Sequence, residues 1–206
     1  MTRRTMAVGT VEPRLACRTL RGGFVPGSAP VYTDGLVHSP GAVSGSVDTA
    51  MINNDVLRSI RYMLDFGDQH VVELAKLVDP AFPLEKTDVQ AFLRRDDDPD
   101  YVECSDRVLA HVLDGLVIHC RGRNDSLPAR PLEKRVTNNL VLKKLRVAFE
   151  LKDIDLHDVF AAAGFPLSKP EMTALFRQPD HHNYRACGDQ LLRNFLKGLT
   201  LRVRGG

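Results

Sequence analysis

The fold of this chain is decided by a segment that occurs twice, as CSDRVLAHVLDGL at residues 104–116 and as CGDQLLRNFLKGL at residues 187–199. In both copies apolar residues return every three or four positions, which is the period of an amphipathic helix. Asp106 and Asp189 stand in the first turn, where a carboxylate interacts favourably with the positive end of the helix dipole. The segment therefore predicts the same helix at two places in the chain.

The similarity extends outward from this helix to a whole repeat. Each copy opens with an asparagine pair, Asn53-Asn54 and Asn138-Asn139, and FPL at residues 82–84 returns as FPL at residues 165–167. An arginine and a tyrosine also agree: Arg94 matches Arg177, and Tyr101 matches Tyr184. A two-residue excess near residues 79–81 is the single change of register. Internal repetition of this kind defines the units from which a chain is built.

Apolar spacing predicts four helices in each repeat and no strand. A first helix starts at the asparagines, which we expect to act as N-caps, and it carries apolar residues to position 64 or 149. We expect the second helices over 71–78 and 156–163, the third over 85–94 and 168–177, and the fourth in the segment quoted above. The predicted fold class is all-α, with two tandem, similar four-helix modules.

Composition divides the chain into four parts. Residues 1–50 hold seven of the fifteen glycines and four of the twelve prolines without sustained apolar periodicity, so we expect a disordered N-terminal extension. The first repeat covers 51–120, a proline-containing linker covers 121–135, and the second repeat covers 136–206. Met51 directly precedes the first repeat, and we therefore expect translation to start there.

The middle of each repeat resembles a helix-turn-helix. In the second copy Gly164 ends the run VFAAAG at residues 159–164, at the place where a repressor-type motif has its turn glycine. Phe160 stands where a small residue is usual, and the first copy has Asp79 in place of the glycine. The helices that would read DNA carry charges of both signs. An ordinary helical hairpin remains the alternative to a DNA-reading one.

The asparagine pair, the Cys-x-Asp before a leucine-rich helix and the Leu-x-Gly-Leu ending resemble the YehS-like bacterial family, in which a domain of unknown function occurs as a tandem pair. The resemblance covers essentially all of residues 51–206. It implies a small, soluble, helical bacterial protein. It implies no activity, cofactor or catalytic residue.

The two repeats carry opposite charge. Residues 51–120 have seven Lys or Arg against fourteen Asp or Glu, a balance of −7, and residues 121–206 have sixteen against nine, a balance of +7. Such a dipole favours docking between the halves or head-to-tail association of chains, and it directs a polyanion to the second half. The candidate nucleic-acid or anion-binding residues are Arg121, Arg123, Arg130, Lys134, Arg135, Lys143, Lys144, Arg146 and Arg177. A solvated linker and helix face is the alternative.

The polar residues shared by both copies also have structural explanations. We expect Arg61 and Arg146 at a packing edge, and Arg94 and Arg177 bonded to carbonyls at the end of the third helix. A pair of pseudo-symmetric anion sites is the functional alternative. Cys104 and Cys187 lie beside a helix start, where we expect them to be buried as small packing residues.

Several classes of function lack their signals. The sequence contains no recognisable nucleophile with its base, no glycine-rich phosphate loop and no His or Cys spacing of a zinc site, so we predict no catalytic residue, no metal and no cofactor. No apolar stretch approaches the roughly 18 residues of a membrane span. We therefore expect a cytoplasmic protein with no membrane partner.

The function expected from these observations is a non-enzymatic binding or regulatory module. Nucleic acid, bound through the basic second repeat and the linker, is the leading partner. A protein-protein interaction module or a self-assembling oligomer is the close alternative, and an enzyme whose site has no recognisable motif is the third.

Overall fold

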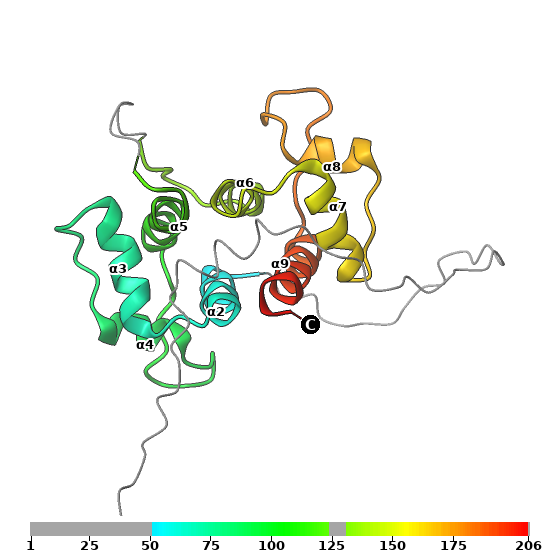
Figure 1. Cartoon of the computed structure of the whole chain (residues 1–206). Helices are drawn as coiled ribbons and strands as arrows, with labels where there is room; N and C mark the ends of the chain where they lie inside the picture. The colour runs from blue at the N-terminus through cyan, green and yellow to red at the C-terminus, as the bar shows by residue number, and fades with distance from the viewer. Residues whose placement is uncertain (1–50, 124–130, 206) are drawn as a thin grey trace, which may run out of the picture.

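The computed structural model describes residues 51–123 and 131–205, which form eight helices and no strand (Figure 1). The first repeat holds α2 (Asn53–Leu64), α3 (Asp68–Val78), α4 (Lys86–Leu93) and α5 (Asp106–Arg121). The second holds α6 (Asn138–Ala148), α7 (Asp153–Ala162), α8 (Lys169–Leu175) and α9 (Asp189–Arg204). The all-α class and the two tandem, similar four-helix modules are confirmed. The expectations for residues 1–50, and for Arg130 in the linker, lie outside the described residues.

The asparagine pairs are not N-caps, so that prediction is wrong. The N-cap of α2 is Ile52, which has no side-chain acceptor, and α6 is capped by Thr137, whose hydroxyl accepts the Leu140 amide at 3.3 Å. The first asparagine of each pair lies inside the helix and reaches across to the start of the last helix of its own repeat. Asn53 donates to the Asp106 carboxylate at 2.8 Å, and Asn138 donates to the Asp189 carboxylate at 2.7 Å.

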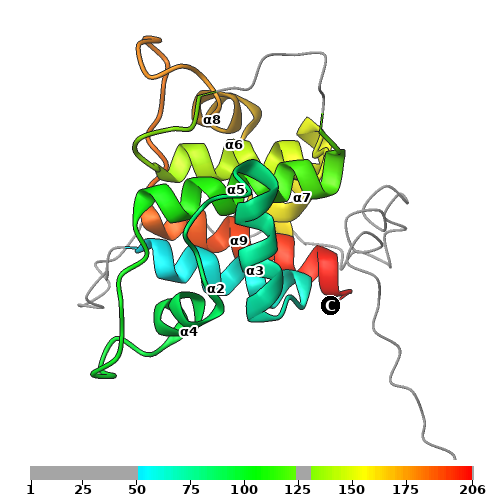
Figure 2. The ribbon, with the colours of Figure 1, turned by 90° about the vertical axis from the view of Figure 1, so that its left-hand side faces the viewer.

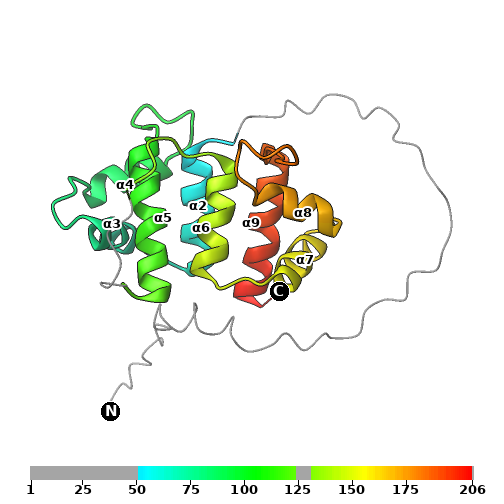
Figure 3. The same ribbon diagram turned by 90° about the horizontal axis from the view of Figure 1, so that it is seen from above.

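Helices α2, α5, α6 and α9 form a central bundle in which all four run in the same direction (Figure 3). The asparagine bonds join the N-terminal ends of α2 and α5, and those of α6 and α9. At the other end, Arg121 at the end of α5 pairs with Glu150 just after α6, and Arg204 at the end of α9 lies 3.9 Å from Asp65 just after α2. The four helix dipoles are therefore aligned.

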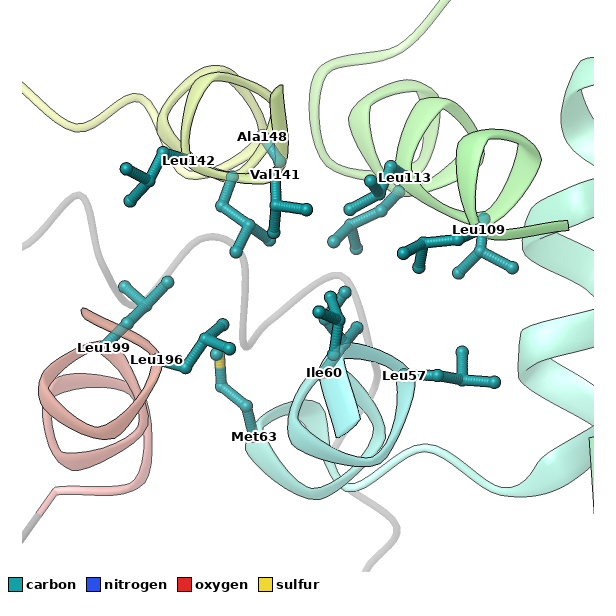
Figure 4. Packing of buried hydrophobic residues seen from close by; sticks show 14 of the residues in the cluster. Leu57, Ile60, Met63, Leu109, Leu113, Val141, Leu142, Ala148, Leu196 and Leu199 are labelled. Atoms are coloured by element: carbon teal, nitrogen blue, oxygen red, sulfur yellow. The ribbon is translucent and has the colours of Figure 1, made fainter. Parts of the chain in front are cut away.

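The two repeats share one hydrophobic core. Within the central bundle, α2 packs more extensively against α9 of the other repeat than against α5 of its own, and α5 packs more extensively against α6 than against α2. Figure 4 looks along this core, where Ile60 and Met63 of α2 face Leu113 of α5 and Leu196 of α9. Since burying each of these side chains contributes on the order of 2 kcal/mol, much of the stability of either repeat depends on the other.

The C-terminal ends of the bundle are joined by two equivalent ion pairs. Glu150 and Asp65 follow the first helix of their repeats, both with φ of 54° in the left-handed region. Each meets the last arginine of the other repeat, Arg121 or Arg204. A third pair, between Lys144 and Asp114, joins α6 to α5. Arg204–Asp65 and Lys144–Asp114 each join a cation of the basic half to an acid of the acidic half, whereas Arg121 and Glu150 both lie within residues 121–206, so attraction between opposite halves accounts for only part of these contacts.

The second helix of each repeat covers the outside of this bundle at very close range (Figure 2). Helix α3 lies against α5, and α7 lies against α9. A Cβ atom on Gly115 would lie 1.8 Å from the Leu74 carbonyl oxygen, and one on Gly198 would lie 1.9 Å from the Val159 carbonyl oxygen. The glycine of the Leu-x-Gly-Leu motif is therefore where the two backbones touch.

The second and third helices form the hairpins that resemble a helix-turn-helix. In the second repeat, Gly164 has φ of 79°, a conformation that favours glycine, and the Phe165 amide bonds the Phe160 carbonyl at 2.9 Å. In the first repeat, Asp79 ends α3 in an extended conformation and its carboxylate accepts the Ala81 amide at 2.9 Å. The two-residue excess is thus absorbed by a different turn, after which Leu84 and Leu167 are both buried.

Candidate anion-binding site

A buried asparagine holds the loop before the last helix in each repeat. Asn54 is completely buried, and its amide donates to the carbonyls of Phe92 at 2.9 Å and Val102 at 2.8 Å while its oxygen accepts the Cys104 amide at 2.8 Å.

Asn139 makes the same three bonds in the second repeat, to Leu175 at 2.8 Å, Arg185 at 2.9 Å and Cys187 at 2.9 Å. The loops 94–104 and 177–187 are therefore placed in the same way on α2 and α6, and their side chains can be compared position by position.

Two cationic side chains stand beside this loop in the first repeat. The guanidinium of Arg58 on α2 donates to the carbonyl of Arg94, which follows α4. Arg58 pairs with Asp55 at 3.0 Å and Asp96 at 3.2 Å, while Arg94 pairs with Asp98 at 3.1 Å and Asp100 at 3.2 Å. Four carboxylates of the same repeat thus surround the two positive charges of Arg58 and Arg94 and neutralise them.

The backbone amide of Asp100, together with Arg94, favours the ionised form of Asp98. The pKa of Asp98 lies below its ordinary value, chiefly because the carboxylate accepts the Asp100 amide; the bond and the charge of Arg94 add to this, against an opposing effect of desolvation. Our expectation that the Arg94 side chain bonds carbonyls at the end of the third helix is wrong: its own carbonyl is the acceptor, and its side chain binds carboxylates.

The second repeat keeps the two cations and lacks the carboxylates. Lys143 on α6 occupies the position of Arg58, and its Nζ donates to the carbonyl of Arg177 at 3.3 Å, as Arg58 does to Arg94. The four acids are replaced, in order, by Leu140, Pro179, His181 and Asn183. Asp180 corresponds to Asp97, which contacts Arg95 and neither member of the pair. Lys143 and Arg177, hereafter the open cationic pair, thus have no carboxylate at the equivalent positions.

A histidine replaces the carboxylate that binds the arginine. Nη1 of Arg177 lies 2.6 Å from Nε2 of His181, and Nδ1 of His181 accepts the Asn183 amide at 3.0 Å, as Asp98 accepts the Asp100 amide. The loop shape is therefore retained. Neither ring nitrogen carries negative charge, so His181 cannot neutralise Arg177 as Asp98 neutralises Arg94. His182 stacks on His181 with ring centroids 4.4 Å apart.

Most of the other candidate basic residues contact their own chain. Arg121 pairs with Glu150, Lys144 with Asp114, and Arg123 donates to the Leu77 carbonyl. Arg146 pairs with Asp153 at 2.8 Å and lies over the Phe176 ring at 4.7 Å.

Arg61 stands at the position equivalent to Arg146, and its Nε lies 3.0 Å from Asp68. The two groups form an ion pair, but their geometry does not meet the criteria of a hydrogen bond. These two arginines thus fix the turn between the first and second helices.

Lys134 and Arg135, in the part of the linker that directly precedes α6, are exposed. They lie just before Thr137, the cap of α6. The loop 177–187 and this part of the linker lie at the same end of the bundle, where the chain enters α6 (Figures 2 and 3). The structure therefore brings Lys134, Arg135 and the open cationic pair to one end, while Arg121 lies at the other. Arg146 follows Lys143 by one turn of α6, and its guanidinium covers the ring of Phe176, next to Arg177.

Cys104 and Cys187 are buried, as we expected, and are not reactive groups of the site. Burial, reinforced by the nearby Asp106 or Asp189, raises the pKa of each thiol to about 12. Because the thiolate is the nucleophile, we expect iodoacetamide at pH 8 to modify both residues on the order of a thousandfold more slowly in the native protein than in urea. Peptide mass spectrometry measures both rates. Equal rates would show that the thiols are accessible and ionisable.

Two further features bear on the class of function. Among the described residues, no group of three or more His, Cys, Asp or Glu side chains could hold a metal ion. In the same part of the chain, no helix has the length and apolar character needed to cross a membrane.

Fold and site together define a helical tandem-repeat protein with one neutralised and one open cationic pair. The chain belongs to the family described as protein of unknown function DUF1456, whose family model matches residues 53–122 and again 138–205. It is similar to the uncharacterised protein YehS of Escherichia coli strain K12, with 43% identity over 152 residues, covering 74% of this chain and 96% of that protein. The resemblance to the YehS-like family is thus confirmed. No solved structure matches the chain.

Sequence reasoning missed the role of Arg58 and of the acids around it. Its signal was present, because aligning the repeats places His181 opposite Asp98 and Asn183 opposite Asp100. The signal lies in the residues that differ between two otherwise equal loops.

Proposed function

We propose that this protein is a non-enzymatic module that binds nucleic acid, with backbone phosphates at the open cationic pair of the second repeat. The observation that carries the proposal is the replacement of the carboxylates around Lys143 and Arg177, while the same two cations in the first repeat keep theirs. A phosphate would take the place that Asp100 holds beside Arg94, since the His181 ring already lies beside Arg177 at the position of Asp98. Arginine suits this role because its planar guanidinium binds two oxygens at once.

Charge elsewhere on the second repeat supports a polyanion over a single anion. The half from residue 121 onward carries a balance of +7, and the exposed Lys134 and Arg135 lie at the same end as the open cationic pair. Two to four phosphate contacts would give a log–log salt slope of about −2 to −4. Lys134, Arg135 and the open cationic pair would thus contact successive phosphates of one nucleic-acid strand.

The test transfers the acids of the first repeat into the second. We expect His181→Asp/Asn183→Asp to bind a fluorescent oligonucleotide at least about tenfold more weakly in anisotropy titrations, with a salt slope shallower by about two, because Arg177 gains internal counterions. The reciprocal variant Asp98→Asn/Asp100→Asn frees Arg94 and should strengthen binding.

Lys169→Gln/Lys197→Gln is the matched control, since it also lowers the net charge by two at exposed positions of the second repeat. It should weaken binding much less than the acid transfer. Equal losses in the two double variants would mean that net charge alone attracts the oligonucleotide. A native chain that binds no oligonucleotide at low salt would overturn the proposal.

A second candidate is head-to-tail association, in which the acidic loop of one copy meets the open cationic pair of another. The acidic loop, residues 94–104 of the first repeat, favours this association because the side chains of Asp96, Asp97 and Asp100 remain more than half exposed. Sedimentation velocity at 20 and 500 mM salt tests this, since such a contact dissociates as salt screens it. A monomer at both salt concentrations excludes it.

A further inference from the structure

The Phe-Pro-Leu motif has the same residues in both repeats and very different surroundings. In the first repeat, Phe82 is 4% exposed and its ring stacks on the imidazole of His111, with centroids 3.7 Å apart and planes 19° apart. The guanidinium of Arg107 lies 5.3 Å from the centre of the same ring. His111 is itself buried and its Nδ1 is 2.7 Å from the Arg107 carbonyl. A planar nitrogen heterocycle thus covers the phenylalanine.

The second repeat retains the phenylalanine without this cover. Phe165 is 41% exposed, although Leu167, two residues later, is buried like its counterpart Leu84. The positions of His111 and Arg107 are taken by Asn194 and Gln190 on α9, whose amide groups bond each other at 3.3 Å. The backbone at Phe165 is fixed by the glycine turn and the bond to Phe160. The point at which the exposed side chain leaves the backbone is therefore fixed.

We propose that Phe165 is a base-stacking residue, so that the nucleic acid bound by this protein is single-stranded. An unpaired nucleobase would cover Phe165 as the imidazole covers Phe82, since both are planar nitrogen heterocycles that stack on an aromatic ring. The amides of Gln190 and Asn194 supply donors and acceptors of the kind that bond base edges. Bases in a duplex are already stacked and paired, so only a single strand offers its faces.

The stacking residue and the phosphate site lie on the same repeat, on either side of α8. The seven residues of this helix, roughly 10 Å long, separate the segment of Phe165 from that of Arg177. A short stretch of single strand would therefore reach both. This inference rests on the proposed function, because the phosphates supply most of the attraction and the base selects the strand.

The test separates bases from phosphates with two labelled fifteen-nucleotide strands, one of thymidine and one of abasic sites, titrated against the full chain by anisotropy. We expect the native protein to bind the thymidine strand about ten- to hundredfold more tightly than the abasic one. Phe165→Ala should abolish this preference and leave affinity for the abasic strand unchanged. Phe165→Tyr keeps the ring and should retain the preference.

Asn194→His provides a second variant that leaves Phe165 in place. It restores the imidazole of the first repeat and should lower affinity for the thymidine strand by competing for the ring. Equal affinity of the native protein for both strands would overturn the stacking inference while leaving the phosphate site intact. Binding of neither strand would overturn the proposed function and the inference with it. An unchanged melting temperature of each variant confirms that it is folded.

Discussion

Gly198→Ala and Gly115→Ala are each expected to lower the free energy of unfolding by roughly 3 kcal/mol or more, which is a large part of the total for a domain of this size. Alanine in a helix interior is by itself favoured over glycine by about 1 kcal/mol. Here the added Cβ would lie within 2 Å of a backbone carbonyl oxygen of the neighbouring helix, which cannot rotate away. The helices must separate, so the clash outweighs the gain in propensity.

Urea denaturation followed by circular dichroism measures this effect. Gly188→Ser is the matched control, because nothing lies within 4 Å of a Cβ at this position and its counterpart in the first repeat is Ser105, the N-cap of α5. We expect the control to be neutral or slightly stabilising. A midpoint for Gly198→Ala equal to that of the unmodified protein would show that α7 and α9 do not touch.

Asn139→Ala and Asn54→Ala are expected to cost about 3 kcal/mol or more each. The change removes three hydrogen bonds at a buried position and leaves two carbonyls and an amide without partners, each worth about 1–3 kcal/mol. In the second repeat the loop carrying Arg177 and His181 would also lose its attachment to α6. We therefore expect Asn139→Ala to weaken oligonucleotide binding as well as stability.

Native-state hydrogen exchange at the Cys187 amide follows this loss directly, because Asn139 is its acceptor. We expect protection there to fall by more than the protection in α5. Asn194→Ala serves as control, since Asn194 accepts a single bond from Gln190, and its cost should stay below about 1 kcal/mol. Unchanged protection at Cys187 in Asn139→Ala would contradict the role assigned to the asparagine.

Much of the fold could be predicted from local sequence pattern. The apolar stripe of α5 and α9 predicted where these helices lie in the chain. The second helices differ from the prediction mainly because they start earlier, at Asp68 and Asp153. Each of these acids pairs with an arginine of the preceding helix, Arg61 or Arg146. The apolar spacing used for the prediction cannot detect an ion pair across a turn.

The partner of each helix could not be predicted in this way. Periodicity shows that Ile60 and Met63 lie on a buried face, but it does not show that this face meets α9 of the other repeat. The same limit explains the asparagines. Asn54 bonds backbone groups 38 to 50 residues away, while its place at a helix start made a local cap the natural expectation.

The candidate site was predictable in part. Lys143 and Arg177 belong to the basic set selected from the sequence, and the excess charge of the second half is visible there. Composition could not distinguish two kinds of cation. Lys144 is paired with Asp114 of its own chain, whereas Lys143 and Arg177 lack the carboxylates that surround their counterparts in the first repeat. That distinction requires the side-chain contacts of both repeats.

The packing of α2 against α9 has a consequence for how the chain is made. Tyr62 at the end of α2 receives a hydrogen bond from Arg204, 142 residues later. At a synthesis rate of about 5–20 residues per second, α2 therefore waits roughly 7–30 s on the ribosome before its partner helix is even polymerised. During that time its apolar face, with Ile60 and Met63, lacks the helix that covers it in the folded protein, and the native core closes only after α9 has left the exit tunnel.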